Sequence, residues 1–204
     1  NAGPFSSYIA PVLEKISDYD LDSLGPGGSL TFDIEANWKL AVENFIEPYH
    51  VFSCHPWLHS FVPMAERDAP TFENHILLCG YTFQSSDPAR GEGLPYFPGL
   101  PEHKKNRGDW FVLFPNFAFE IFPDQLVTLV TTPISAKCSR ETISLYFVGD
   151  GASGKQYQSS KTGMTLTLKT SVFWKECKEA ACPMGLMAAY CLLTGTRYNS
   201  TLPA

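Results

Sequence analysis

The chain has 204 residues, 44% of them hydrophobic, and a formal net charge of −6 at pH 7. These values indicate a globular protein with one sizeable core and exclude a disordered chain. The negative charge argues against nucleic acid or an anionic membrane as a partner, and no apolar run approaches the roughly 18 residues of a membrane span. Six scattered cysteines without a C-x-x-C pair argue against a structural zinc site and predict reduced thiols in the cytoplasm.

The N-terminal part predicts an irregular lead-in followed by a strand. Residues 1–28 mix polar and apolar side chains and end in Gly-Pro-Gly-Gly at 25–28, which is typical of a turn. Residues 30–35 alternate between apolar and polar side chains, as a half-buried strand does. The first residue is Asn and not Met, so we expect a processed chain or, more readily, a fragment.

A helix is expected next. Asn37 has the side chain of a good N-cap, and apolar residues from Trp38 to Tyr49 recur at helical spacing. Pro48 removes a backbone donor within this stripe and is expected to kink the helix. Pro56 predicts that regular helix ends by residue 54 or 55.

The middle of the chain predicts an antiparallel sheet. Short connections join consecutive strands, which favours a meander. The predicted strands are residues 76–83, 110–114, 117–122, 126–133 and 142–148. A long loop at 86–108 and helix-compatible residues at 155–193 complete the pattern. We therefore predict an α+β fold, with one antiparallel sheet and helices before and after it.

Two histidines and a carboxylate lie within nine residues of the predicted helix. Glu47 and His50 are three residues apart and would share a helix face, whereas His55 can converge with His50 only if the helix unwinds. Two imidazoles and an acid with open positions form the facial triad of non-haem Fe(II) oxygenases. Buried histidines that simply hydrogen-bond within a core are the alternative, and the spacing alone leaves both open.

This segment resembles the catalytic-domain signature of the Rieske non-haem iron oxygenases, the ring-hydroxylating oxygenase α subunits. The matching residues are Asn37-Trp38-Lys39, Glu43-Asn44, Glu47, Tyr49-His50 and His55-Pro56, with Gly91-Glu92-Gly93-Leu94-Pro95 and residues 110–116 in the sheet. The resemblance covers about residues 5–150. It implies a helix-grip (START/Bet v 1-like) fold. We interpret residues 1–204 as one catalytic domain, without the N-terminal Rieske domain that members of the family carry.

The resemblance also implies the site and its chemistry. His50 and His55 would bind Fe(II), Glu47 would bridge a ligand histidine to the Rieske cluster of a neighbouring subunit, and Asn44 and Tyr49 would support them. The implied reaction is O₂-dependent mono- or dioxygenation of an aromatic ring, or of a C–H next to nitrogen, as in the demethylation of a quaternary amine. Electrons would come from a reductase or ferredoxin through a [2Fe-2S] cluster, and the intact protein would be a homotrimer.

Two features depart from the family pattern. The C-x-H and C-x(2)-H spacings that hold a Rieske cluster do not occur, so that cluster would have to come from a missing domain or another chain. The family's third iron ligand is an aspartate on a late helix, yet no aspartate follows Asp150. Glu179 is the nearest substitute, although it also fits a solvated helix charge beside Lys178. A frameshift near residue 180 would explain the loss of the aspartate.

Candidate pocket residues are the phenylalanines of the sheet and the motif. Aromatic side chains suit a flat apolar substrate by stacking or a quaternary ammonium by cation–π contact, whereas ordinary core packing is the alternative for each. The candidates are Phe52, Phe83, Phe117, Phe119 and Phe122. Two other functions stay open: an inactive helix-grip module that binds a small ligand after losing the iron carboxylate, and a zinc hydrolase, for which no separate base is visible.

Overall fold

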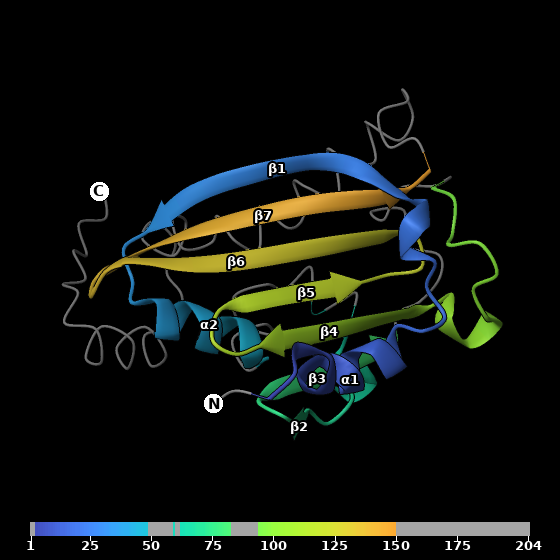
Figure 1. Cartoon of the computed structure of the whole chain (residues 1–204), viewed down its shortest axis with the longest axis horizontal. Coiled ribbons are helices and arrows are strands. Elements are labelled where there is room, and N and C mark those ends of the chain that lie inside the picture. Colours follow the sequence, from blue (N-terminus) through green and yellow to red (C-terminus); the bar gives the residue numbers. More distant parts are fainter. Residues whose placement is uncertain (1–2, 49–58, 60–61, 83–93, 150–204) are drawn as a thin grey trace, which may run out of the picture.

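The computed structural model describes residues 3–48, 59, 62–82 and 94–149, and its central element is a seven-stranded antiparallel sheet. Figure 1 shows the strands in the order β1-β7-β6-β5-β4-β3-β2. The strands are β1 (Leu24–Ile34), β2 (Thr71–Glu73), β3 (Ile76–Thr82), β4 (Arg107–Leu113), β5 (Phe117–Ile121), β6 (Gln125–Ser135) and β7 (Cys138–Val148). The helices are α1 (Phe5–Lys15) and α2 (Trp38–Ile46), with short 3₁₀ turns η1 (Leu21–Ser23), η2 (Met64–Glu66) and η4 (Glu102–Lys104).

The predicted meander is confirmed. Strands β2 to β7 follow one another in the sheet, each antiparallel to the next, and β1 pairs with β7 along the opposite edge. The five strands predicted from residue 76 onward correspond to β3 to β7. The short β2 was not predicted, and the helix expected at 155–193 lies outside the described residues.

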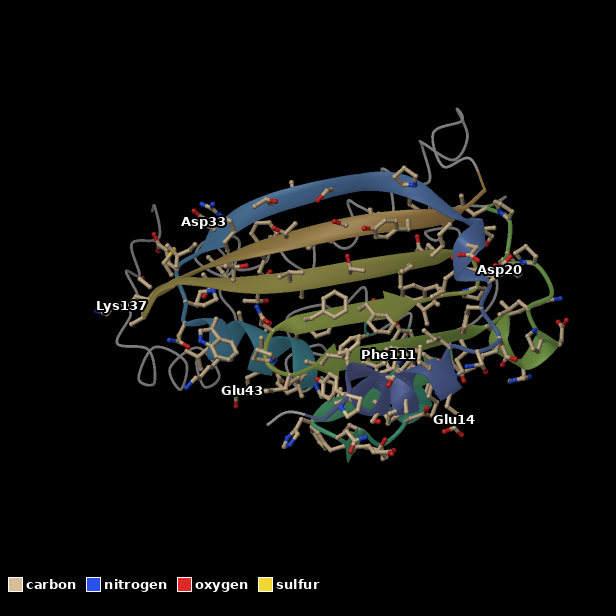
Figure 2. All side chains as sticks on the ribbon, viewed as in Figure 1. Glu14, Asp20, Asp33, Glu43, Phe111 and Lys137 are labelled. Atoms are coloured by element: carbon tan, nitrogen blue, oxygen red, sulfur yellow. The ribbon has the colours of Figure 1, made fainter. Side chains whose placement is uncertain are left out.

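Side chains on the two faces of the sheet form two separate hydrophobic cores. Cross-strand partners share a face because side chains alternate along each strand. The first core, here the α2-facing cluster, contains Val62, Leu77, Tyr81, Leu94, Trp110, Val112, Ala118, Phe122, Val127, Leu129, Ile143, Leu145 and Phe147, with Val42, Phe45 and Ile46 of α2 against it. The second, the α1-facing cluster, contains Val12, Ile16, Tyr19, Ile76, Leu78, Phe97, Leu100, Phe111, Leu113, Phe119, Ile121 and Val148. The sheet therefore lies between the two helices, and Figure 2 shows Phe111 beside α1.

The start of α2 is fixed by Asn37, as predicted. The Asn37 side chain accepts a hydrogen bond from the Lys39 backbone N–H at 3.0 Å, which satisfies one of the free donors of the first turn. Its Nδ2 also donates to the Ala136 carbonyl at 3.0 Å. The cap thus ties the beginning of α2 to the turn between β6 and β7.

The end of α2 differs from the prediction. The helix stops at Ile46, and Glu47 is extended with ψ 133°. A residue that precedes proline is pushed out of the helical region by the proline ring. Pro48 therefore ends this helix instead of kinking it.

The N-terminal lead-in was also predicted wrongly. Residues 5–15 form α1, which carries Pro11 and packs few buried residues. The Gly-Pro-Gly-Gly sequence is part of β1, where the register with β7 shifts between Pro26 and Gly28. Gly28 has a φ of 133°, which favours glycine, and a Cβ atom at Gly27 would overlap the ring of Phe147. The glycines thus serve a bulge in an edge strand.

Among the described residues, no helix is both long and apolar enough to cross a membrane. Cys79 and Cys138 are free thiols. The other cysteines lie outside the described residues.

Gly27→Ala is expected to destabilise the fold, because the added methyl group meets the fully buried ring of Phe147. Overpacking of this kind costs about 1–3 kcal/mol. Chemical denaturation of the variant should show the loss as a lower midpoint. Gly3→Ala is the control, since nothing lies within 4 Å of its added Cβ. Equal midpoints for the two variants would contradict the close packing of β1 on β7.

Candidate active site

The last turns of α2 pack on an aromatic surface of the sheet. The ring of Phe45 meets the ring of Trp110 edge to face, with their centroids 5.2 Å apart. Tyr81 and Phe122 lie on the same face of the sheet and contact each other at 6.2 Å between centroids. We call Tyr81, Trp110 and Phe122 the aromatic wall. The chain leaves α2 at Glu47, two residues after Phe45, so the described part of the chain ends its helix close to this wall.

Only two of the predicted site residues can be located. Asn44 lies in α2 and Glu47 directly follows it, and both are partly buried. His50, His55 and Glu179 lie outside the described residues, as does Tyr49. Within the part of the chain that is described, no three His, Cys, Asp or Glu side chains are grouped so that they could hold a metal ion.

One expected relation between site residues is wrong. Glu47 and His50 were predicted to share a helix face, yet α2 has already ended at Glu47. The Glu47 backbone N–H still donates to the Glu43 carbonyl at 3.0 Å, which closes the last helical turn. The Glu47 side chain therefore projects from an extended residue, held at its N-terminal side by the helix and at its C-terminal side by Pro48.

The candidate pocket phenylalanines fall on both faces of the sheet. Phe122 belongs to the α2-facing cluster, as a pocket residue should. Phe119 is a member of the α1-facing cluster and Phe117 packs against it, so neither lies on the face that α2 covers. Side chains alternate along β5, and its odd-numbered residues point toward α1. Phe52 and Phe83 lie outside the described residues.

Polar groups on the α2 face were missed from the sequence. Arg67 places its guanidinium Cζ 5.4 Å from the Tyr81 ring centroid and 6.0 Å from that of Trp110. Glu120 shares the face of Trp110 and Val127, its two cross-strand partners. No motif marks either residue, and only the strand register reveals their position.

A third polar group is buried farther along the same face. Glu141 is 6% exposed and pairs across the sheet with Phe32 and Thr131. Burial raises the pKa of its carboxyl group to about 7, while a hydrogen bond from Thr131 at 3.4 Å acts in the opposite direction. This carboxyl group is consequently protonated in mildly acidic solution.

Comparison with protein families decides the relationship. The family model for the ring hydroxylating alpha subunit (catalytic domain) matches residues 21–171. The chain belongs to this family. A comparison with curated proteins finds no match.

Solved structures of ring-hydroxylating oxygenases share this fold. The quaternary ammonium Rieske monooxygenase CntA, in complex with an inhibitor, aligns with a TM-score of 0.65 at 16% identity over 86% of this chain. CntA in complex with L-carnitine gives 0.55 at 15% identity over 84%. Naphthalene 1,2-dioxygenase from Rhodococcus sp. bound to indole gives 0.55 at 18% identity over 82%. In each case the match covers 46% of the other chain, so this chain spans about half the length of these structures.

The wild-type protein is expected to lose stability as the pH rises, because Glu141 must then ionise in the core. Glu141→Gln should remove this loss. Because the folded-state pKa is raised from 4.5 to about 7, the protonated form favours folding below pH 4.5, and this contribution is lost as the pH rises through about 7. The loss should amount to about 3 kcal/mol in the wild type and be absent in the variant. Denaturation midpoints measured from pH 4 to pH 9 test this.

Asp33→Asn provides the matched control on a neighbouring strand. Hydrogen bonds from Arg140 lower the pKa of the Asp33 carboxyl group. The contribution of Asp33 to the stability of the fold is therefore lost as the pH falls. The two variants should therefore change opposite ends of the stability profile. A Glu141→Gln profile parallel to that of the wild type would contradict the raised pKa.

Proposed function

We propose that residues 1–204 form a single catalytic domain of an O₂-dependent mononuclear non-haem iron oxygenase. The observation that carries the proposal is the family match over residues 21–171, which includes the whole histidine motif. The described structure adds support, since α2, which directly precedes that motif in the sequence, packs on an apolar, aromatic face of the sheet. An apolar, aromatic surface suits the binding of an apolar substrate.

His50 and His55 would hold the iron, with Glu179 as the third ligand. Two imidazoles and one carboxylate match the donor preference of Fe(II) and leave coordination positions open. The metal would supply the activation of O₂. These three side chains come from two distant parts of the sequence, and the proposed helix-grip arrangement would bring a late helix against the α2 face.

Asn44 and Glu47 would act beside the metal ligands. Glu47 projects from the residue at which α2 ends, so its carboxylate can accept a hydrogen bond from a ligand imidazole and fix its orientation. The same carboxylate would connect that imidazole to an electron donor. Asn44 lies in the preceding turn of α2, from which its amide can hydrogen-bond to the motif.

The aromatic wall would form one side of the substrate pocket. Tyr81, Trp110 and Phe122 offer flat apolar surfaces that pack against an aromatic ring and can also hold a quaternary ammonium. One kind of ligand is bound by each of two similar structures. CntA, a quaternary ammonium monooxygenase, binds L-carnitine, and naphthalene 1,2-dioxygenase binds indole, an aromatic molecule. The proposed reaction is therefore hydroxylation of an aromatic ring or of a C–H next to nitrogen.

The complete enzyme would need further components. The C-x-H and C-x(2)-H pattern of a Rieske [2Fe-2S] cluster is absent from the 204 residues, so this cluster would belong to another domain or a neighbouring subunit. A ferredoxin or reductase would deliver electrons to it. We propose a homotrimer in the cytoplasm as the working form.

An inactive binding module is the second candidate. It is favoured by one observation, the absence of aspartate after Asp150, where the family places an iron ligand. Such a module would keep the aromatic wall and bind a small ligand without turnover. Metal content separates the two functions.

The full chain, loaded anaerobically with Fe(II), is expected to bind about one iron per polypeptide through its histidines. His50→Ala and His55→Ala should each abolish this binding, whereas His103→Ala, in η4, should leave it unchanged. Iron determination after desalting gives the stoichiometry. Binding of zinc in preference to iron would favour a hydrolase, and no metal in the wild type would favour the binding module.

Glu179→Ala tests the third ligand separately. Loss of one of three ligands should weaken Fe(II) binding by more than the roughly 10- to 100-fold that loss of a hydrogen-bond partner of a ligand costs, while Glu176→Ala serves as the neighbouring control. A competition titration with a chelator measures the affinity. Unchanged affinity in Glu179→Ala would exclude this residue as a ligand and leave a two-histidine site.

A further inference from the structure

Arg67 is held over the aromatic wall by its backbone. It directly follows η2, where its N–H donates to the Met64 carbonyl at 3.3 Å, and it forms an isolated antiparallel bridge with Tyr81. The next residue, Asp68, donates its N–H to the Gly80 carbonyl at 2.8 Å. These contacts fix the segment beside β3, so that the guanidinium lies against the rings of Tyr81 and Trp110.

Three N–H donors in this place have no hydrogen-bond acceptor among the described residues. Nε and Nη2 of Arg67 are buried without a partner, and so is Nε1 of Trp110, a residue only 8% exposed. A buried donor left without an acceptor costs about 1–3 kcal/mol, and more where the group is charged. Cation–π contact with the rings offsets part of this cost but uses no N–H donor.

The other cations that are buried or partly buried against the sheet in the described structure, Lys104 and Arg107, are paired. Lys104 donates to Asp109 at 2.7 Å and to the Lys15 carbonyl at 3.2 Å. Arg107 forms ion pairs with Asp68 and Asp109. The carboxylate adjacent to Arg67 in sequence, Asp68, thus belongs to the opposite face of the sheet. Glu120, on the face of Trp110, accepts no hydrogen bond from Arg67 Nε or Nη2.

We propose that Arg67 and Trp110 bind the carboxylate group of the substrate. A guanidinium presents parallel N–H donors that match the two oxygens of a carboxylate, and burial strengthens such charge-assisted bonds. Nε1 of Trp110 is a further donor within the same cluster. This inference rests on the proposed function, since only an oxygenase would make the bound carboxylate a substrate. It narrows the proposed substrates to small molecules that carry a carboxylate.

The position of this subsite beside the end of α2 gives it a role in orientation. Phe45 packs on Trp110 and lies two residues before Glu47. A carboxylate held at Arg67 would therefore anchor one end of the substrate against the wall, with its apolar body along the rings toward the motif. Arg67 is a specificity-determining residue in this arrangement.

Calorimetric titration of the full chain tests the proposal with two pairs of probes. Benzoate is compared with benzamide, and γ-butyrobetaine with its amide, so that each pair differs only in the carboxylate. At least one carboxylate should bind about tenfold or more tightly than its amide. Arg67→Met should abolish this preference, whereas Arg140→Met, which removes an exposed arginine paired with Asp33, should retain it.

A second measurement follows the indole directly. The ¹⁵N–H signal of Trp110, assigned with Trp110→Phe, should shift on addition of the preferred carboxylate and remain in place in Arg67→Met. Equal binding of carboxylates and amides in the wild type, or a preference that survives Arg67→Met, would overturn the proposal.

The same titrations keep this inference separate from the oxygenase proposal. In His50→Ala the carboxylate preference should persist without iron, because Arg67 and Trp110 lie outside the motif. A chain that binds carboxylates but no iron would retain the subsite and lose the oxygenase assignment. A chain that binds iron without preferring carboxylates would keep the oxygenase assignment and exclude the carboxylate subsite.

Discussion

The alternation of side chains across one antiparallel sheet is the constraint on which the rest of this structure depends. Each strand sends successive residues to opposite faces, so seven strands in fixed register build two cores that share no side chain. α1 covers one core and α2 the other (Figure 1). A strand residue can take part in the candidate site only if its side chain points to the face of the sheet that α2 covers. Trp110 and Phe122 meet that condition, whereas Phe111 and Phe119 do not.

Much of this architecture could be predicted because local patterns and tertiary packing agree. Strands β3 to β7 are rich in apolar and β-branched residues and are joined by short connections, and Asn37 begins α2 as a side-chain cap. The failures have physical causes. Gly-Pro-Gly-Gly resembles a turn, but a bulge beside the Phe147 ring uses the same residues. α1 was missed because a helix with Pro11 and few buried residues has a weak periodic signal.

The candidate site was predictable where its residues are close in sequence, and not where they are brought together by the sheet. The segment from Asn37 to Pro56 carries its own pattern, including Glu47 and the two histidines. Arg67 and Trp110 are distant in sequence and meet only because β3 pairs with β4 and η2 returns beside β3. Likewise, Glu141 looks like an ordinary polar residue of β7 until the register places it inside the core.

The two faces also treat charge differently, and this difference supports a division of roles. On the α1 side, Lys104, Asp109 and Arg107 form a connected network in which each charge has a partner, and Lys104 reaches the end of α1. Such pairing fixes a helix on a sheet without leaving a buried charge uncompensated. On the α2 side, Arg67 and Trp110 keep donors that find no acceptor in the described part of the chain, and burial favours the neutral form of Glu141. Unpaired polar groups destabilise a core, so the donors of Arg67 and Trp110 on the α2 side are the arrangement expected of a binding site, where a ligand completes the pairing.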